Sequence, residues 1–324
     1  MKPKVFVTRK LPEKALEIIR AECEMEINPY DRKITREELI EGVKNKDGLL
    51  CLLTDKIDEK IIESGKNLRI IANYAVGYDN IDVNAANKRK IPVTNTPGVL
   101  TDTTADMAWA LIFTIVRRVT EADKFTKAGK YKGWGPMMFL GGDVYGKTLG
   151  IIGLGRIGKA VAKRAKGFDI KLLYFDAFRA DEKVEKEMNV EFTDLETLLK
   201  KSDFISIHVP LLPSTHHLIG KKELSMMKKT AYLINNSRGP VIDEKALVKA
   251  LREKKIAGAA LDVFENEPEL SPGLADLENV VLTPHISSAS IETRTKMAIM
   301  AAENLLAGLK GIRPPNIVNP EVLE

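Results

Sequence analysis

Short apolar runs alternate with amphipathic or charged stretches along nearly the whole sequence. The runs have the length of buried strands, and the stretches between them have the spacing of amphipathic helices. Such an alternation predicts an α/β fold, in which helices connect the strands of parallel sheets. At 324 residues the chain is long enough for two domains, and a hydrophobic fraction of 44% supplies apolar side chains for two cores.

The predicted strands fall into two series. Four strands of the first series cover residues 4–9, 48–54, 68–77 and 91–98, with helices such as 11–22 and 35–45 between them. A helix that starts at Thr101 introduces the second series, whose six strands cover residues 148–155, 170–176, 204–210, 231–237, 257–264 and 279–285. Six strands with intervening helices predict a Rossmann-type, doubly wound nucleotide-binding domain.

A last helical stretch, residues 288–310, cannot extend the second sheet, so we place it on the first domain. The sequence therefore predicts a nucleotide-binding domain over residues 100–287. We expect this domain to be inserted into a smaller, flavodoxin-like α/β substrate domain made of residues 1–99 and 288–324.

Composition and charge argue against several classes of protein. The net charge of +5 comes from 50 basic and 45 acidic residues, without a basic run carrying aromatic residues, so we expect no nucleic-acid partner. The longest apolar run, residues 107–116, is too short to span a bilayer, and no signal peptide is visible. Cys23 and Cys51 have no metal-ligand spacing, so we expect buried thiols in a cytoplasmic protein without a metal site.

A glycine-rich loop, Gly153-Leu-Gly-Arg-Ile-Gly158, follows one predicted strand and precedes a helix. In this context the first glycine permits a tight turn, the second lets a pyrophosphate approach the backbone, and the third lets helix and strand pack closely. Asp176 ends the next strand, where a carboxylate accepts hydrogen bonds from ribose hydroxyls, which favours NAD. Arg179 could instead bind a 2′-phosphate, so NADP stays possible.

Three polar residues follow late strands of the second series. Arg238, Glu267 and His285 come after the strands at 231–237, 257–264 and 279–285, and the carboxyl ends of these strands meet at the edge where such sheets bind ligands. Each alone has a simpler interpretation: a surface arginine, an acidic turn, or a histidine of the core. Their convergence on one edge favours a shared site.

The chemistry of these side chains fits the reduction of a 2-oxo acid. An arginine offers a planar, bidentate contact to a carboxylate. A histidine exchanges protons near neutral pH, and a neighbouring carboxylate orients the imidazole and favours the imidazolium form. We therefore predict that Arg238 binds a substrate carboxylate and that Glu267 and His285 form an acid/base pair.

The chain resembles the D-isomer-specific 2-hydroxyacid dehydrogenase family, and is most similar to its archaeal glyoxylate and hydroxypyruvate reductase branch. The resemblance rests on the motifs NYAVGYDNID, TNTPGVLTDTTAD, GKTLGIIGLGRIGKAVA, HVPLLPSTHHLI, INNSRGPVID, ALDVFENEP and TPHISSAS, which run over nearly the whole chain. The family carries its carboxylate-binding arginine, its glutamate and its acid/base histidine in the last three motifs. In this sequence those residues are Arg238, Glu267 and His285.

The resemblance also implies the remaining contacts. Together with the glycine loop it places cofactor contacts at Thr104, Gly153, Gly155, Arg156, Ile157, Gly158, Asp176, Ala177, Arg179, Val209, Pro210, Asn236, Ser237, Arg238, Asp262, His285 and Ser287. Substrate contacts are expected from Leu53, Val76, Gly77, Arg238 and His285, and from Trp134 of a partner subunit. His208, His216 and His217 are interpreted as structural. The family forms homodimers through its nucleotide-binding domain.

The implied activity is reduction of glyoxylate, and of hydroxypyruvate, with a reduced nicotinamide cofactor. A D-3-phosphoglycerate dehydrogenase and a D-lactate-type enzyme remain alternatives within the family. A formate dehydrogenase is disfavoured because that branch is expected to carry glutamine at the position of Glu267. A non-enzymatic, NAD-sensing protein similar to the C-terminal-binding corepressors is the alternative from another class.

Overall fold

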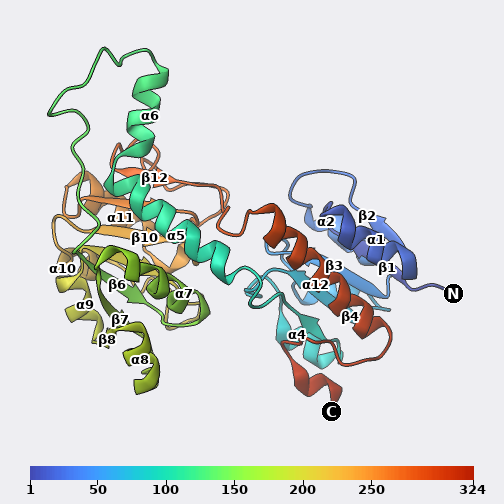
Figure 1. Cartoon of the computed structure of the whole chain (residues 1–324). Coiled ribbons are helices and arrows are strands. Elements are labelled where there is room, and N and C mark those ends of the chain that lie inside the picture. The colour runs from blue at the N-terminus through green and yellow to red at the C-terminus, as the bar shows by residue number, and fades with distance from the viewer. The chain divides into compact units, whose positions relative to one another are not determined.

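The computed structural model describes all residues of the chain, 1–324, which divide into two compact units. Unit 1 consists of residues 1–100 and 289–324, and unit 2 of residues 101–288. Each unit contains a single parallel sheet with helices on both of its faces (Figure 1). The predicted α/β class is confirmed.

The sheet of unit 1 has five parallel strands in the order β2-β1-β3-β4-β5. Their bounds are β1 Lys4–Val7, β2 Glu24–Ile27, β3 Gly48–Leu52, β4 Ile70–Tyr74 and β5 Val93–Thr94. This is the flavodoxin-like strand order. Strand β2 was not among the predicted strands, because its sequence EMEI is half charged and lies at the sheet edge with Glu24 and Glu26 exposed.

Helices cover both faces of the unit 1 sheet. Helices α1 (Glu13–Glu22) and α12 (Ile291–Leu309) pack on one face, where Leu16, Ile19 and Leu305 are buried. Helices α2 (Arg36–Val43), α3 (Glu59–Ser64) and α4 (Val83–Lys88) belong to the core on the other face. The chain ends after the 3₁₀ helix η3 (Pro320–Leu323).

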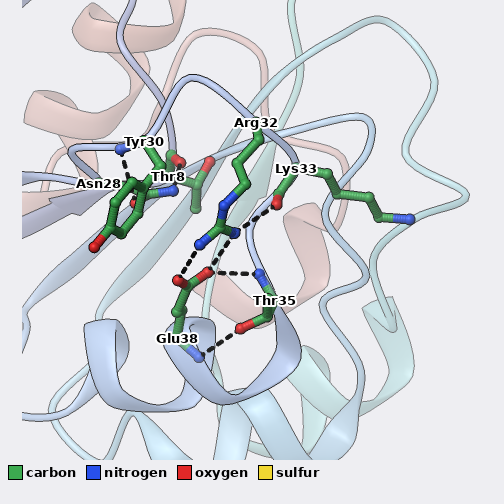
Figure 2. A network of polar contacts seen from close by, with 7 residues as sticks. All are labelled: Thr8, Asn28, Tyr30, Arg32, Lys33, Thr35 and Glu38. Atoms are coloured by element: carbon green, nitrogen blue, oxygen red, sulfur yellow. Dashed lines mark hydrogen bonds and ion pairs between the residues drawn. The ribbon is translucent and has the colours of Figure 1, made fainter.

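The connection from β2 to α2 is tied down by a polar network at the carboxyl edge of this sheet (Figure 2). The Asn28 amide donates to the Thr8 carbonyl at 3.0 Å, which fixes the start of the loop. Thr35 and Glu38 form a capping box at the first turn of α2. Arg32 donates two hydrogen bonds to the Glu38 carboxylate, and this contact lowers the pKa of Glu38 to about 2.

The sheet of unit 2 has seven parallel strands in the order β12-β11-β10-β9-β6-β7-β8. Their bounds are β6 Thr148–Ile152, β7 Lys171–Phe175, β8 Val190–Phe192, β9 Phe204–Ile207, β10 Tyr232–Asn235, β11 Gly258–Leu261 and β12 Val280–Leu282. The strand order reverses between β6 and β9, which makes this the topological switch point where doubly wound sheets bind ligands. Seven strands replace the six predicted, since β8 has only three residues and lies at an edge.

Two hydrophobic cores hold the helices of unit 2 against this sheet. Helices α5 (Thr101–Val116) and α7 (Arg156–Ala165) belong to one core, where the Trp109 indole donates to the Val161 carbonyl at 3.1 Å. Helices α9 (Leu195–Lys201), α10 (Lys221–Met226) and α11 (Glu244–Arg252) belong to the other. The 3₁₀ helix η1 (Lys166–Phe168) follows α7, and α8 (Glu182–Met188) precedes β8. None of the helices in the structure combines the length and the apolar character that a membrane crossing needs.

Helix α6 (Val119–Lys127) and the loop after it project from the rest of unit 2 (Figure 1). We call residues 119–145 the arm. No residue of α6 is buried, and the arm exposes the large apolar side chains of Val119, Tyr131, Trp134, Met137, Met138, Leu140 and Tyr145. Such a concentration of exposed apolar side chains is typical of an interaction surface.

Candidate active site

The glycine-rich loop lies between β6 and α7, at the switch point of the unit 2 sheet. Gly153 has a φ of +96°, and a Cβ there would lie 2.9 Å from the backbone of His208. A Cβ on Gly158 would lie 2.1 Å from the Gly153 carbonyl oxygen, so both positions exclude larger residues. Above Gly155 there is open space, because nothing lies within 4 Å of its ideal Cβ position.

The first turn of α7 is suited to bind phosphate. Gly155 is the N-cap residue and no side chain caps the helix, so the amides of Arg156 and Ile157 at the first turn have no side-chain acceptor. Uncapped amides at a helix N-terminus attract anions. The open space over Gly155 therefore fits the pyrophosphate of a dinucleotide.

Asp176 follows β7, the strand next to β6 in the sheet. One carboxylate oxygen accepts from the Leu154 amide at 2.8 Å, and the other accepts from the Phe178 amide at 3.3 Å. The carboxylate is thus fixed beside the glycine loop and keeps lone pairs for other donors. This is the placement that binding of ribose hydroxyls requires. The neighbouring Ala177 is exposed, and Arg179 forms an ion pair with Glu185 at 2.8 Å.

Arg238 lies three residues after the end of β10, in a turn that the Asn235 side chain organises. The Asn235 amide donates to the Arg238 carbonyl at 2.9 Å, and its oxygen accepts from the Ser237 amide at 3.1 Å. The guanidinium of Arg238 donates to the Ser237 carbonyl at 2.9 Å. Arg238 is half-buried, so its charge is carried at the rim of the unit rather than in the core.

Gly239 brings the Arg238 turn directly against the chain that leaves β11. A Cβ at Gly239 would lie 1.9 Å from the carbonyl carbon and oxygen of Phe264 and 2.5 Å from the Glu265 amide. Only glycine permits this approach of two backbones. The 3₁₀ helix η2 (Gly239–Val241) begins at this contact.

Asp262, directly after β11, fixes the loop that carries His285. One oxygen of its buried carboxylate accepts from the Thr283 hydroxyl at 2.6 Å and the Ile286 amide at 2.8 Å. The other accepts from the Ser287 amide at 2.7 Å and from the Ser287 hydroxyl. Four hydrogen bonds fill the acceptor sites of a carboxylate, so Asp262 holds both sides of His285 in place.

Glu267 and His285 are paired. The Glu267 carboxylate lies 2.9 Å from His285 Nδ1 and also accepts from the Phe264 amide at 3.0 Å. Burial alone would raise the pKa of Glu267, but the hydrogen bond and charge of His285, the Phe264 amide and the charge of Arg238 outweigh it and lower the pKa. Glu267 is therefore an ionised partner that occupies Nδ1 and leaves Nε2 of the imidazole for another group.

In unit 1, the loop after β4 is held by its carbonyl groups. The Ala75 carbonyl accepts from the Thr96 amide and the Val76 carbonyl accepts from the Asn95 side chain, both at 2.8 Å. Because a trans peptide points its N–H away from its C=O, these contacts direct the amides of Val76 and Gly77 away from the 95–96 segment. Leu53, after β3, is half-buried.

The remaining predicted cofactor residues cluster at the carboxyl ends of β9 and β10. The Ser237 hydroxyl donates to the Val209 carbonyl, which ties the two strand ends together. The buried Asn236 amide donates to the Thr104 carbonyl of α5 at 2.9 Å, while Pro210 is exposed. Trp134 lies in the arm with 83% of its surface exposed.

The other histidines have partners of their own. His208 shares a hydrogen bond of 2.9 Å with the Ser206 hydroxyl, and burial lowers the pKa of His208 to about 3, so it is neutral at physiological pH. The ring of His217 lies 2.7 Å from the Glu265 carboxylate and stacks on His216.

Comparison with known proteins gives the family. The doubly wound sheet with a glycine loop at its switch point defines a dinucleotide-binding protein, and a family model described as "D-isomer specific 2-hydroxyacid dehydrogenase, NAD binding domain" matches residues 109–287. The glyoxylate reductases of Korarchaeum cryptofilum and Thermococcus litoralis are 56% and 54% identical over 327 residues, covering 100% of this chain and 98% of each relative. The chain belongs to the D-isomer-specific 2-hydroxyacid dehydrogenase family.

One of the similar solved structures contains a nicotinamide cofactor. The NADPH-dependent glyoxylate/hydroxypyruvate reductase of Sinorhizobium meliloti, in complex with NADP and malonate, matches with a TM-score of 0.86 and 31% identity. The match covers 98% of this chain and 97% of that one. The resemblance to the family and the Rossmann-type fold predicted from the sequence are thus confirmed.

Three structurally important residues were not singled out from the sequence. Asn235 organises the arginine turn, Gly239 allows it to contact the chain near Glu267, and Glu185 binds Arg179. The sequence did contain a signal for Gly239, because a glycine directly after Arg238 indicates a close backbone approach. The roles of Asn235 and Glu185 depend on side-chain contacts within the fold, which no local pattern indicates.

Proposed function

We propose that this protein reduces glyoxylate, and also hydroxypyruvate, to the 2-hydroxy acid with NADH. The observation that carries the proposal is the pairing of Glu267 with His285 at 2.9 Å, beside the turn in which Gly239 brings Arg238 against the chain that leads to Glu267. An ionised carboxylate, an imidazole and a guanidinium thus share one edge of a dinucleotide-binding sheet. The names of the two archaeal relatives support the choice of substrate.

The side chains divide the work of the reaction. Arg238 binds the carboxylate of the substrate through its planar guanidinium. His285 donates its Nε2 proton to the carbonyl oxygen, which becomes the hydroxyl of the product, and Glu267 stabilises the imidazolium before that transfer. When bound, the dihydronicotinamide ring supplies the hydride to the carbonyl carbon. The imidazole then regains a proton from solvent for the next turnover.

Unit 1 supplies the other substrate contacts in this proposal. The amides of Val76 and Gly77, which the fixed carbonyls of Ala75 and Val76 orient, are the proposed hydrogen-bond donors of unit 1 to the substrate, and Leu53 is a further proposed contact. We accordingly assign residues 1–99 and 288–324 to the substrate domain and residues 100–287 to the nucleotide-binding domain.

The arm supports a homodimer formed through the nucleotide-binding domain. Its seven large apolar side chains are exposed to solvent, as is typical of a surface that binds another protein, and Trp134 is the most exposed of them. We propose that the arm packs on a second copy of the chain and that Trp134 reaches the substrate pocket of the partner. The two buried free thiols, Cys23 and Cys51, support a location in the reducing cytoplasm.

A substrate panel tests the activity. Loss of reduced-nicotinamide absorbance is followed with glyoxylate, hydroxypyruvate, pyruvate and 3-phosphohydroxypyruvate. The proposal expects the highest kcat/KM for glyoxylate or hydroxypyruvate. A clear preference for 3-phosphohydroxypyruvate or pyruvate would replace it by one of the alternative dehydrogenases. Binding of NADH without turnover of any 2-oxo acid would point to a sensor instead.

A further inference from the structure

Arg179 is the cation best placed by sequence to bind a 2′-phosphate. It follows Asp176 by three residues, in the segment between β7 and α8. In doubly wound domains an acid at the end of this strand binds the ribose 2′-hydroxyl of NAD, whereas a nearby arginine accommodates the 2′-phosphate of NADP. This chain carries both the acid, Asp176, and the arginine, Arg179. The side chains that bind these two residues therefore decide whether the protein favours NAD or NADP.

The guanidinium of Arg179 is held by Glu185. Nε and Nη2 of the arginine donate to the two carboxylate oxygens of Glu185 at 2.9 and 2.8 Å, a bidentate geometry. The guanidinium also lies over the ring of Phe192 in β8, 5.6 Å from its centroid. Although 62% of the Arg179 side chain is exposed to solvent, Nε and Nη2 both donate to Glu185 and are not available to another anion.

Glu185 is itself anchored to the sheet. Its side chain is only 10% exposed and accepts a hydrogen bond of 2.5 Å from the hydroxyl of Tyr174. Tyr174 is fully buried in β7, and its hydroxyl also accepts from the Ala180 amide at 2.9 Å. The contacts of Arg179 and Tyr174 lower the pKa of Glu185 to about 2, so the carboxylate stays ionised over the whole working pH range.

The residue at the end of β7, Asp176, is negatively charged, whereas the 2′-phosphate of NADPH requires a positive charge there. Asp176 is fixed against the glycine loop by the Leu154 amide, and its carboxylate repels a 2′-phosphate while accepting from ribose hydroxyls. Arg179 is the cation that could offset this repulsion, and an anchored anion already binds it.

We propose that Glu185 is a specificity-determining positioning residue: by binding Arg179 it withdraws that cation from a 2′-phosphate and so favours NADH over NADPH. The inference rests on the cofactor half of the proposed function. It does not depend on which 2-oxo acid is reduced. Release of Arg179 from Glu185 should therefore raise the affinity for NADPH and leave that for NADH nearly unchanged.

Equilibrium binding of NADH and NADPH to the full-length protein, followed by the fluorescence of the reduced nicotinamide without substrate, tests this inference. Glu185→Gln is expected to tighten NADPH binding about two- to five-fold, the range that loss of a competing ion pair supports. Glu182→Gln is the matched control. It removes the same charge from the same helix, but Glu182 pairs with Lys186 at 2.6 Å and acts on Arg179 through its charge, without the bidentate hydrogen bonds of Glu185, so we expect the NADH-to-NADPH preference to change much less.

A double-mutant cycle with Arg179→Ala completes the test. The inference expects Arg179→Ala to weaken NADPH binding much more in the Glu185→Gln background than in the wild type. An equal loss in both backgrounds would overturn it, because Arg179 would then reach the phosphate despite its partner; this comparison needs only folded protein, checked by thermal melting. An unchanged preference in Glu185→Gln would also overturn it. A wild-type protein that binds neither nucleotide would instead refute the cofactor assignment itself.

Discussion

Replacement of Gly239 by alanine tests the contact that joins the arginine turn to the chain near Glu267. The added Cβ would lie 1.9 Å from the carbonyl carbon and oxygen of Phe264. Both partners are backbone, so no flexible side chain can move aside. Relief to an ordinary contact of 3.4 Å requires a separation of about 1.5 Å between the two segments.

We expect that movement to reduce the catalytic rate strongly and the free energy of unfolding moderately. Arg238 precedes Gly239 directly, and Glu267 follows Phe264 by three residues, so the separation moves the guanidinium relative to the acid/base pair. A misplacement of about 1 Å reduces catalysis roughly 10²-fold. Overpacking of this kind costs about 1–3 kcal/mol of unfolding free energy.

The assay is kcat/KM for glyoxylate at saturating NADH, with thermal unfolding and the NADH dissociation constant measured on the same samples. Gly167→Ala is the control, because it makes the same substitution in the same unit where nothing lies within 4 Å of the new Cβ. We expect Gly239→Ala to lose about 10²-fold in kcat/KM with NADH binding largely retained. A Gly239→Ala variant as active as Gly167→Ala would refute the reasoning.

Three further substitutions address single side chains. Arg238→Lys keeps the charge but loses the bidentate fork, so kcat/KM for glyoxylate should fall at least about 10²-fold with a much smaller change in NADH affinity; equal kinetics would contradict its role. Glu267→Gln removes the ionised carboxylate that lies 2.9 Å from His285 Nδ1, so the alkaline limb of the pH profile for glyoxylate reduction should move to lower pH. A pH profile identical to that of the wild type would show that Glu267 does not assist proton transfer. Asp262→Asn places an NH₂ group opposite the backbone amide of Ile286 or Ser287, so one amide loses its acceptor. The loss should cost about 2 kcal/mol of unfolding free energy and lower kcat. Thermal melting and steady-state kinetics check this, and a stable, fully active variant would show that Asp262 is not needed to hold the His285 loop.

The sequence predicted the architecture well because most strands are buried on both faces. Runs such as Ile70–Tyr74 and Thr148–Ile152 are apolar nearly throughout, as strands between two layers of helices must be. The two strands that it did not predict, Glu24–Ile27 and Val190–Phe192, lie at sheet edges and are short or half charged. An edge strand lacks the apolar signature on which the prediction depends.

The candidate site was predictable to the extent that it follows strand ends. Arg238 and His285 each come three residues after the end of a strand, so their position at one edge of the sheet follows from topology. The chemistry of the side chains also predicted the pairing of Glu267 with His285, but not the hydrogen bonds that hold the surrounding loops. For Asp262 the resemblance to the family implies a cofactor contact, which stays a prediction, and the structure adds that both carboxylate oxygens bind the His285 loop.

Arg179 shows the same limit at the cofactor end of the site. Its position after Asp176 left NAD and NADP both open, and nothing in the local sequence indicates that a glutamate six residues further on binds it. That contact depends on the hydroxyl of Tyr174, which holds Glu185 from the buried side of the sheet. Side-chain partners of this kind are set by tertiary packing rather than by periodicity.

The central claim is that His285 supplies the proton for reduction of a 2-oxo acid. It is tested most directly by comparing glyoxylate reduction by the wild type and His285→Ala at saturating NADH, with the NADH dissociation constant measured for both. The account predicts turnover by the wild type and a loss of roughly 10²–10⁴-fold in kcat for the variant, with NADH still bound. A variant that retains the wild-type kcat, or a wild type that binds NADH but reduces no 2-oxo acid, would contradict it.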